Sequence, residues 1–174
     1  MKSAGEIKWV GVSGSWRTTC PELEDDLRHE VTKILNDGNG IVSGGALNVD
    51  YEATSLALEH YPDGSHIKVI IPTALEIYAA HYRKRAGEGV ITTDQAEALI
   101  KQLELVKKLG SLTCMDFQEV TLETYFLRNT EVVNQSDELL ALQVNESGGV
   151  QDTVEKAQQQ HKPVKLFSYT VEQA

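Results

Sequence analysis

The sequence predicts an α/β fold, because short apolar segments alternate along it with segments of helical periodicity. The apolar segments are continuous rather than alternating, which is typical of parallel strands that are covered on both faces. The chain has 174 residues, the size of one domain. It shows no internal repeat, low-complexity segment or linker. We therefore expect residues 1–174 to form a single Rossmann-like domain, with an open, mainly parallel sheet and helices on both faces.

The first part of the chain contains three predicted strands and two helices. An apolar strand at Lys8–Ser13 precedes a helix that begins at Pro21, whose missing N–H needs no partner in a first helical turn. The turn residues Asn36–Gly40 end this helix. The elements expected next are a strand at Ile41–Ser43, a helix at Val49–His60 and a strand at Ile67–Ile71 that ends at Pro72.

The rest of the chain begins with a less regular segment. A helix over Ala74–Ala86 ends in the basic cluster His81–Arg85, and Thr93 is expected to cap an amphipathic helix that runs to Leu109. Residues 74–110 are therefore interpreted as a helical insertion. The remaining expected elements are a short strand near Leu112–Val120, a helix at Thr121–Asn134, a strand at Glu138–Val144, a helix at Val150–His161 and a strand at Val164–Ser168.

Composition narrows the classes of function. The chain has 26 acidic and 16 basic residues, a formal net charge of −10. This argues against a general binder of duplex nucleic acid, which needs a basic face, but leaves room for a local basic pocket. No apolar segment is long enough for a membrane helix, and no signal peptide is recognisable, so we expect a cytoplasmic protein. The five histidines and two cysteines form no metal-binding pattern, so no metal is expected.

Small and polar residues collect after three of the predicted strands. The carboxyl ends of parallel strands lie at one edge of a sheet, where ligands bind. Glycine allows close approach there, and the N–H groups of a following helix attract anions. The sequence therefore predicts a phosphorylated ligand, held by neither a dinucleotide fingerprint nor a P-loop. The candidate ligand-binding residues are Ser13, Gly14, Ser15, Arg17, Gly44, Gly45, Ala46, Asp50, Arg128, Asn129, Asn145, Ser147, Gly148, Gly149 and Asp152.

Two of these residues have specific predicted roles. Arg17 is suited to clamping a phosphate through two hydrogen bonds, or is a solvated loop arginine. Asp50 either binds a ribose hydroxyl or fixes the glycine turn before its helix.

The basic cluster His81–Arg85 is either a solvated helix end or, with its tyrosines, a surface for nucleic-acid bases. We also expect Gly45→Val to abolish ligand binding without unfolding the protein.

Four segments, VGVSGSWR, IVSGGALNVDYEAT, YFLRNTEVVNQSDELLAL and SGGVQDTVEKA, resemble the superfamily of the Smf/DprA DNA-processing proteins and the LOG phosphoribohydrolases. The resemblance spans most of the chain and is weakest over 74–109. The DprA signature S-G-x-A-x-G-x-D-x-x-A matches except that Asn48 replaces its second glycine. In the LOG pattern, Ser147 replaces a proline and Gln151-Asp152 replace Gly-Thr. The matching positions are Ser43, Gly44, Ala46, Asp50, Ala53, Arg128, Asn129, Ser136, Asp137, Gly148, Gly149 and Glu155.

The resemblance implies three alternative functions. The first is binding of a nucleotide or nucleotide-derived phosphorylated ligand at the carboxyl edge of the sheet. The second is cleavage of the N-glycosidic bond of a nucleoside monophosphate, with Arg128 and Glu155 as catalytic residues; Asp152 argues against it by repelling phosphate. The third is DprA-like binding of single-stranded DNA, which the negative charge disfavours. The sequence leaves open whether the protein is an enzyme. The resemblance also implies a homodimer or a higher homo-oligomer.

Overall fold

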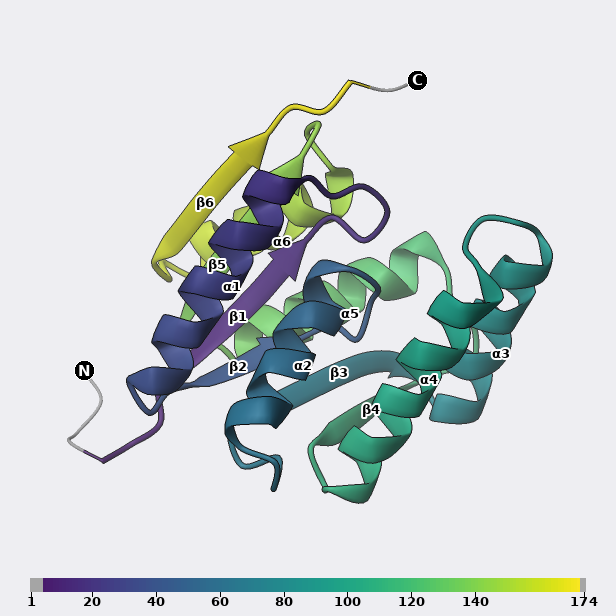
Figure 1. Cartoon of the computed structure of the whole chain (residues 1–174), viewed down its shortest axis with the longest axis horizontal. Coiled ribbons are helices and arrows are strands. Elements are labelled where there is room, and N and C mark those ends of the chain that lie inside the picture. The colour runs from purple at the N-terminus through teal and green to yellow at the C-terminus, as the bar shows by residue number, and fades with distance from the viewer. Residues whose placement is uncertain (1–4, 173–174) are drawn as a thin grey trace.

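The computed structural model describes residues 5–172, and these form one α/β domain around an open sheet of six parallel strands (Figure 1). The strand order is β4-β3-β2-β1-β5-β6. The predicted fold class is confirmed. In chain order the elements are β1 (Trp9–Gly14), α1 (Pro21–Asn36), β2 (Gly40–Ser43), α2 (Val49–His60), β3 (Ile67–Thr73), α3 (Leu75–Gly87), α4 (Thr93–Lys108), β4 (Leu112–Phe117), α5 (Leu122–Asn134), β5 (Glu138–Val144), α6 (Gly148–Gln159) and β6 (Val164–Tyr169).

The helices form two layers of unequal size. Helices α1, α2 and α4 cover one face of the sheet, and α3 packs against α4 beyond the end of β3 (Figure 1). Helices α5 and α6 pack together on the opposite face, against β3 and β5. The larger core therefore lies on the first face, and it includes Leu23, Leu35, Val49, Leu99 and Leu142, all of which are fully buried.

Two boundaries differ from the sequence prediction for identifiable reasons. Strand β3 continues through Pro72 to Thr73. The register between β3 and β4 shifts between Ile71 and Thr73, so the missing N–H of Pro72 falls at an irregularity and does not remove a hydrogen bond from the regular ladder. Helix α4 is capped by Thr92 rather than Thr93. The Thr92 side chain accepts a hydrogen bond from the Gln95 N–H, and the Gln95 side chain accepts one from the Thr92 N–H.

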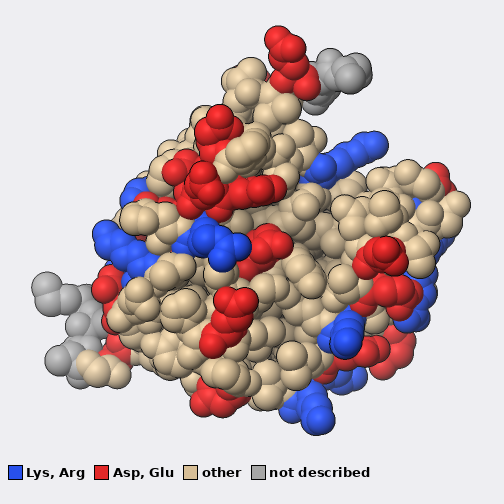
Figure 2. Space-filling model, viewed as in Figure 1, with Lys and Arg blue, Asp and Glu red and all other residues tan. Residues whose placement is uncertain are grey.

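The chain reverses its direction of progress across the sheet at β1. From β1 it proceeds through β2 and β3 to β4 on one side, and it then returns to β5 and β6 on the other side. The loops that follow β1 and β5 therefore diverge and leave a crevice, which is the usual ligand site of such folds. The face seen in Figure 2 carries mixed charges, with acidic residues gathered near the first turn of α1, which contains Glu22 and Glu24.

Candidate functional site

A cavity of about 450 Å³ lies at the carboxyl ends of β1, β2 and β5. Its size is typical of small-molecule sites. The loop after β1, the loop after β2 and the start of α6 form one side of the cavity, and α3 and α5 form the other. The lining residues are Val12, Ser13, Gly14, Trp16, Arg17, Gly44, Ala46, Asp50, His81, Tyr82, Arg85, Val90, Ile91, Leu122, Tyr125, Arg128, Asn129, Val132, Ser147, Gly149, Val150 and Thr153.

Two glycines allow the walls of this cavity to approach one another. A Cβ atom on Gly14 would lie 2.4 Å from the methyl carbons of Val49, so the start of α2 could not pack against the end of β1. A Cβ atom on Gly44 would lie 2.6 Å from the guanidinium carbon of Arg128. The absence of side chains at these two positions brings α2 and Arg128 to the edge of the sheet.

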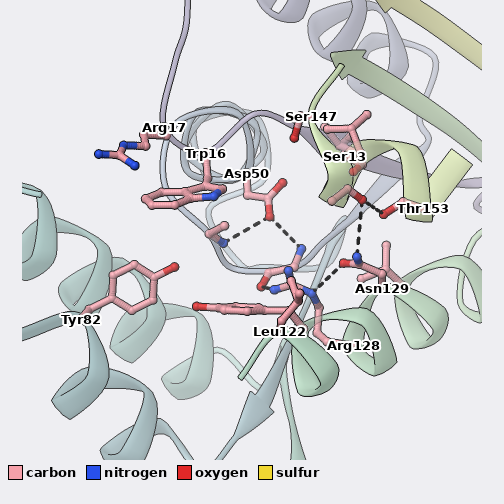
Figure 3. A pocket seen from close by; sticks show the side chains of 18 of the residues that line it. Ser13, Trp16, Arg17, Asp50, Tyr82, Leu122, Arg128, Asn129, Ser147 and Thr153 are labelled. Carbon is pink, nitrogen blue, oxygen red and sulfur yellow. Dashed lines mark hydrogen bonds between the residues drawn. The ribbon is translucent and has the colours of Figure 1, made fainter. Parts of the chain in front are cut away.

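Asp50 and Arg128 are linked through the same backbone residue (Figure 3). The Asp50 carboxylate accepts hydrogen bonds from the N–H groups of Gly44 and Ala46, both at 3.2 Å. Arg128 donates to the Gly44 carbonyl oxygen. Asp50 is 6% exposed, and its burial raises the pKa of the carboxyl group, while the Arg128 charge and the two N–H groups oppose that rise. The loop after β2 thus holds a carboxyl group and a guanidinium group together in the cavity.

Both side chains keep hydrogen-bonding capacity for a ligand. The two hydrogen bonds of Asp50 use the same oxygen, Oδ2, and its Oδ1 has no partner among the described residues. The Arg128 Nε donates to the Asn129 Oδ1 at 3.2 Å, and the guanidinium lies 5.1 Å from the Tyr125 ring centre. The Nη2 of Arg128 has no hydrogen-bond partner within the part of the chain that the structure describes.

The cavity lining has more basic than acidic side chains although the protein is acidic. Three arginines line it, Arg17, Arg85 and Arg128, against one carboxyl group, Asp50. Arg85 is paired with Glu88 at 3.3 Å, so the excess of positive charge comes from Arg17 and Arg128. His81 adds little charge at neutral pH, because burial and the nearby Arg85 and Lys84 lower its pKa while Glu88 opposes them more weakly. This local excess of positive charge suits an anionic ligand.

Three predicted ligand residues support the loops and do not line the cavity. The Ser15 hydroxyl accepts a hydrogen bond from the Val144 N–H at 3.1 Å, which ties the end of β1 to β5. Asn145 has a φ of 51° and exchanges two hydrogen bonds of 2.9 Å with the backbone of Val171. The Gly45 carbonyl oxygen accepts a hydrogen bond from the buried Tyr78 hydroxyl at 2.9 Å.

Gly148, Asp152 and Glu155 also lie outside the cavity lining. The Asp152 carboxylate pairs with Lys156 at 2.8 Å and accepts a hydrogen bond from Asn129 at 3.1 Å, so its charge is balanced within the protein. Glu155 is exposed and accepts a hydrogen bond from Gln151 at 3.0 Å. The structure thus does not bring Glu155 together with Arg128. The negative charge of Asp152, which the sequence analysis expects to repel phosphate, is neutralised by Lys156.

The remaining ten candidate residues do line the cavity. They are Ser13, Gly14, Arg17, Gly44, Ala46, Asp50, Arg128, Asn129, Ser147 and Gly149.

Sequence reasoning missed most of the aromatic and apolar lining. The basic cluster divides: Arg83 pairs with Glu97 of α4 at 2.8 Å, whereas His81, Tyr82 and Arg85 line the cavity. Tyr82 was considered only as a surface for nucleic-acid bases. Trp16 precedes the predicted ligand residue Arg17 in the sequence, whereas no motif near Leu122 or Tyr125 indicates that they line a binding site. Also missed were Val90, Ile91, Val132, Val150 and Thr153.

Gly45→Val is expected to destabilise the fold itself, contrary to the expectation from sequence. Gly45 has a φ of +68°, and a Cβ there would lie 2.7 Å from the Ile71 side chain. Strain and overpacking together should lower the free energy of unfolding by more than about 2 kcal/mol in chemical denaturation. Gly148→Ala is the control, because a Cβ at Gly148 meets nothing within 4 Å. Equal denaturation midpoints for the two variants would contradict this account.

Comparison with solved structures places the fold. DNA processing protein A (DprA) from Helicobacter pylori, described for its single-stranded DNA binding mode, matches with a TM-score of 0.66 and 19% identity over 96% of this chain and 66% of that one. DprA from Streptococcus pneumoniae matches with a TM-score of 0.62 and 17% identity over 97% and 51%. The chain therefore spans at most about two thirds of either DprA chain. The structural-genomics target TM1055, a LOG-family protein, matches with a TM-score of 0.50 and 14% identity over 91% and 72%.

This protein has the Rossmann-like fold of the DprA and LOG proteins. The resemblance inferred from the four sequence segments is confirmed at the level of the fold. No protein-family model and no curated protein matches the sequence. Within residues 5–172, no helix is long and apolar enough to cross a membrane, and no group of three or more metal-ligating side chains is assembled.

Proposed function

We propose that this protein binds a nucleotide, or a phosphorylated compound derived from one, in the cavity between β1 and β5. The observation that carries the proposal is the composition of that cavity. Three arginines, the start of α6 and one buried carboxyl group line it together with tyrosine and aliphatic side chains. A nucleotide has the matching parts, an anionic phosphate, a ribose with hydroxyl groups and a flat apolar base.

The polar side of the cavity offers a partner for each polar part of such a ligand. The first turn of α6 lines the cavity through its N-cap residue Ser147 and through Gly149, and it presents free backbone N–H groups and the positive end of the helix dipole to a phosphate. Arg17 lies exposed at the rim, and Figure 3 shows its guanidinium directed away from Ser147 and Asp50. The free Asp50 Oδ1 is suited to accept a hydrogen bond from a ribose hydroxyl.

The alternative of N-glycosidic hydrolysis has less support. Glu155 lies outside the cavity, so the predicted pair of Arg128 and Glu155 is not assembled. Asp50 is the one carboxyl group in the lining, and two N–H groups already hold it. We therefore propose binding and assign no reaction.

The alternative of single-stranded DNA binding rests on the DprA neighbours. The cavity has the volume of a site for one small ligand, and Arg83 of the basic cluster is paired with Glu97. We therefore favour a single nucleotide over a strand. Association into a homo-oligomer stays a prediction from the resemblance.

Thermal unfolding with added ligands tests the proposal. We expect AMP to raise the melting temperature, with a stabilisation of about 2.7 kcal/mol at a hundredfold excess over Kd, and ribose 5-phosphate to do so less. Inorganic phosphate and a short oligothymidylate serve as comparisons. Glu155→Gln, a change outside the cavity, should leave the shift unaltered. A melting temperature that does not respond to AMP, GMP or ADP-ribose would refute the proposal, and a response to the oligonucleotide alone would favour DNA binding.

A further inference from the structure

The guanidinium group of Arg128 is held at two of its three nitrogen atoms. Nη1 donates to the Gly44 carbonyl oxygen, and Nε donates to the Asn129 Oδ1 at 3.2 Å (Figure 3). Arg128 and Asn129 are consecutive residues of α5, and both are buried in the cavity lining. A planar group that is held at two nitrogens has a defined direction, so these two contacts decide where the unpartnered Nη2 points.

The amide group of Asn129 has further contacts on its other side, with α6. Its Nδ2 donates to the Asp152 carboxylate at 3.1 Å and lies 3.5 Å from the Gly149 carbonyl oxygen. A carboxylate only accepts hydrogen bonds and a guanidinium only donates them, so the amide fits between the two groups in one orientation. Asp152 therefore keeps the acceptor atom of Asn129, Oδ1, turned toward Arg128.

Asp152 is itself fixed by Lys156, one turn further along α6. The Lys156 Nζ lies 2.8 Å from the Asp152 Oδ2, and it donates to the Phe126 carbonyl oxygen of α5 at 2.6 Å. Lys156 thus holds the carboxylate between two packed helices and balances its charge. Since Asp152 also lies outside the cavity lining, its contact with Asn129 adds no unbalanced negative charge to the site.

We propose that Asp152 is a positioning residue for the binding site. It holds the Asn129 amide, which in turn holds the Arg128 guanidinium with Nη2 available to an anionic ligand. The inference rests on the proposed binding of a phosphorylated ligand. Ordering a long side chain before the ligand arrives lowers the entropic cost of binding, so Asp152 should strengthen binding. Repulsion of phosphate by the same carboxylate would have the opposite effect.

Exchange of the Arg128 Nε–H proton with water tests the positioning without any ligand. It is measured by nuclear magnetic resonance, and the signal is identified by its absence in Arg128→Met. We expect slow exchange in the wild type, because the proton is buried and hydrogen-bonded. Asp152→Ala should make exchange about threefold to tenfold faster, the change that corresponds to one hydrogen bond.

Two further variants serve as controls for Asp152→Ala. Asp152→Asn keeps an oxygen atom that can accept from Asn129, so its exchange rate should stay within about twofold of the wild type. Glu155→Ala removes an exposed carboxylate from the same helix, where it contacts Gln151 only, and should leave the exchange rate unaltered.

The affinity for AMP, measured by calorimetry, tests the effect on binding. We expect Asp152→Ala to weaken binding by about threefold to tenfold, and Asp152→Asn to bind as the wild type does. In the Arg128→Met background, Asp152→Ala should cause no further loss, because the carboxylate acts through the guanidinium. A role of Asp152 in the stability of α6 alone would reduce the affinity by the same factor in both backgrounds.

Melting temperatures show whether each variant is folded. Alanine is favourable within a helix, so Asp152→Ala should keep α6 intact. Asn129→Ala removes the same hydrogen bond from its other end and serves as a second variant. Its effect on the exchange of the Arg128 proton should be at least as large.

The outcomes separate the inference from the function on which it rests. Unchanged exchange in Asp152→Ala and Asn129→Ala, or an equal loss of affinity with and without Arg128, would overturn the positioning role. Tighter binding of AMP by both Asp152→Ala and Asp152→Asn would also overturn it, and would mean that Asp152 repels phosphate. Faster exchange in Asp152→Ala, together with no binding of AMP to the wild type, would overturn the proposed function and leave the positioning of the guanidinium standing.

Discussion

Replacing Asp50 by alanine is expected to lower the free energy of unfolding by about 2–6 kcal/mol. The Asp50 carboxylate is the acceptor for the buried N–H groups of Gly44 and Ala46, and alanine leaves both without a partner. Asp50→Asn is the matched control, because its amide oxygen can accept both hydrogen bonds in the place of Oδ2. Urea denaturation of the three proteins measures the difference. Equal losses in the alanine and asparagine variants would show that the hydrogen bonds are not the cause.

The asparagine variant also tests the protonation of Asp50. Burial raises the pKa of Asp50, so the folded protein binds a proton more tightly there than the unfolded chain does. The stability from this group is therefore full below the usual carboxyl pKa of about 3.9, and it is lost as pH rises through the folded pKa. Asp50→Asn cannot lose a proton, so its stability relative to the wild type should increase with pH across that window. A difference independent of pH would contradict the raised pKa.

Replacing Arg128 by methionine is expected to weaken the binding of AMP by tenfold to hundredfold or more. Arg128 is 7% exposed, lies in the cavity lining and keeps an unused donor group, Nη2. A hydrogen bond from a buried guanidinium to an anion is worth about 1.5–3 kcal/mol, which corresponds to that loss. Calorimetry on folded protein measures it, with melting curves to account for the lost contact to the Gly44 carbonyl oxygen.

Arg83→Met is the control for Arg128→Met. It removes the same charge from the same acidic protein, but Arg83 is exposed, pairs with Glu97 and lies outside the cavity lining. Its affinity for AMP should match that of the wild type. A similar loss in both variants would mean that overall charge, rather than a contact with Arg128, governs binding.

The sequence by itself determined the order of the elements and the edge of the sheet at which the site lies. Continuous apolar segments such as Glu138–Val144 can be buried on both faces only within a covered parallel sheet. In such a sheet, the glycine-bearing loops after β1, β2 and β5 end at the same edge whatever the detailed packing. For this reason Gly14, Gly44 and Gly149 could be placed together from local pattern alone, and all three line the cavity.

Only the tertiary structure decided which side chains face that cavity from the helices. Glu155 and Thr153 are two residues apart on α6, yet Thr153 is buried against the cavity and Glu155 is exposed, because the contact of α6 with α5 and β5 fixes its rotation. In the same way, α3 presents Tyr82 to the cavity and Arg83 to α4. Helical rotation is set by packing between segments far apart in the chain, and such packing leaves no signal in the local sequence.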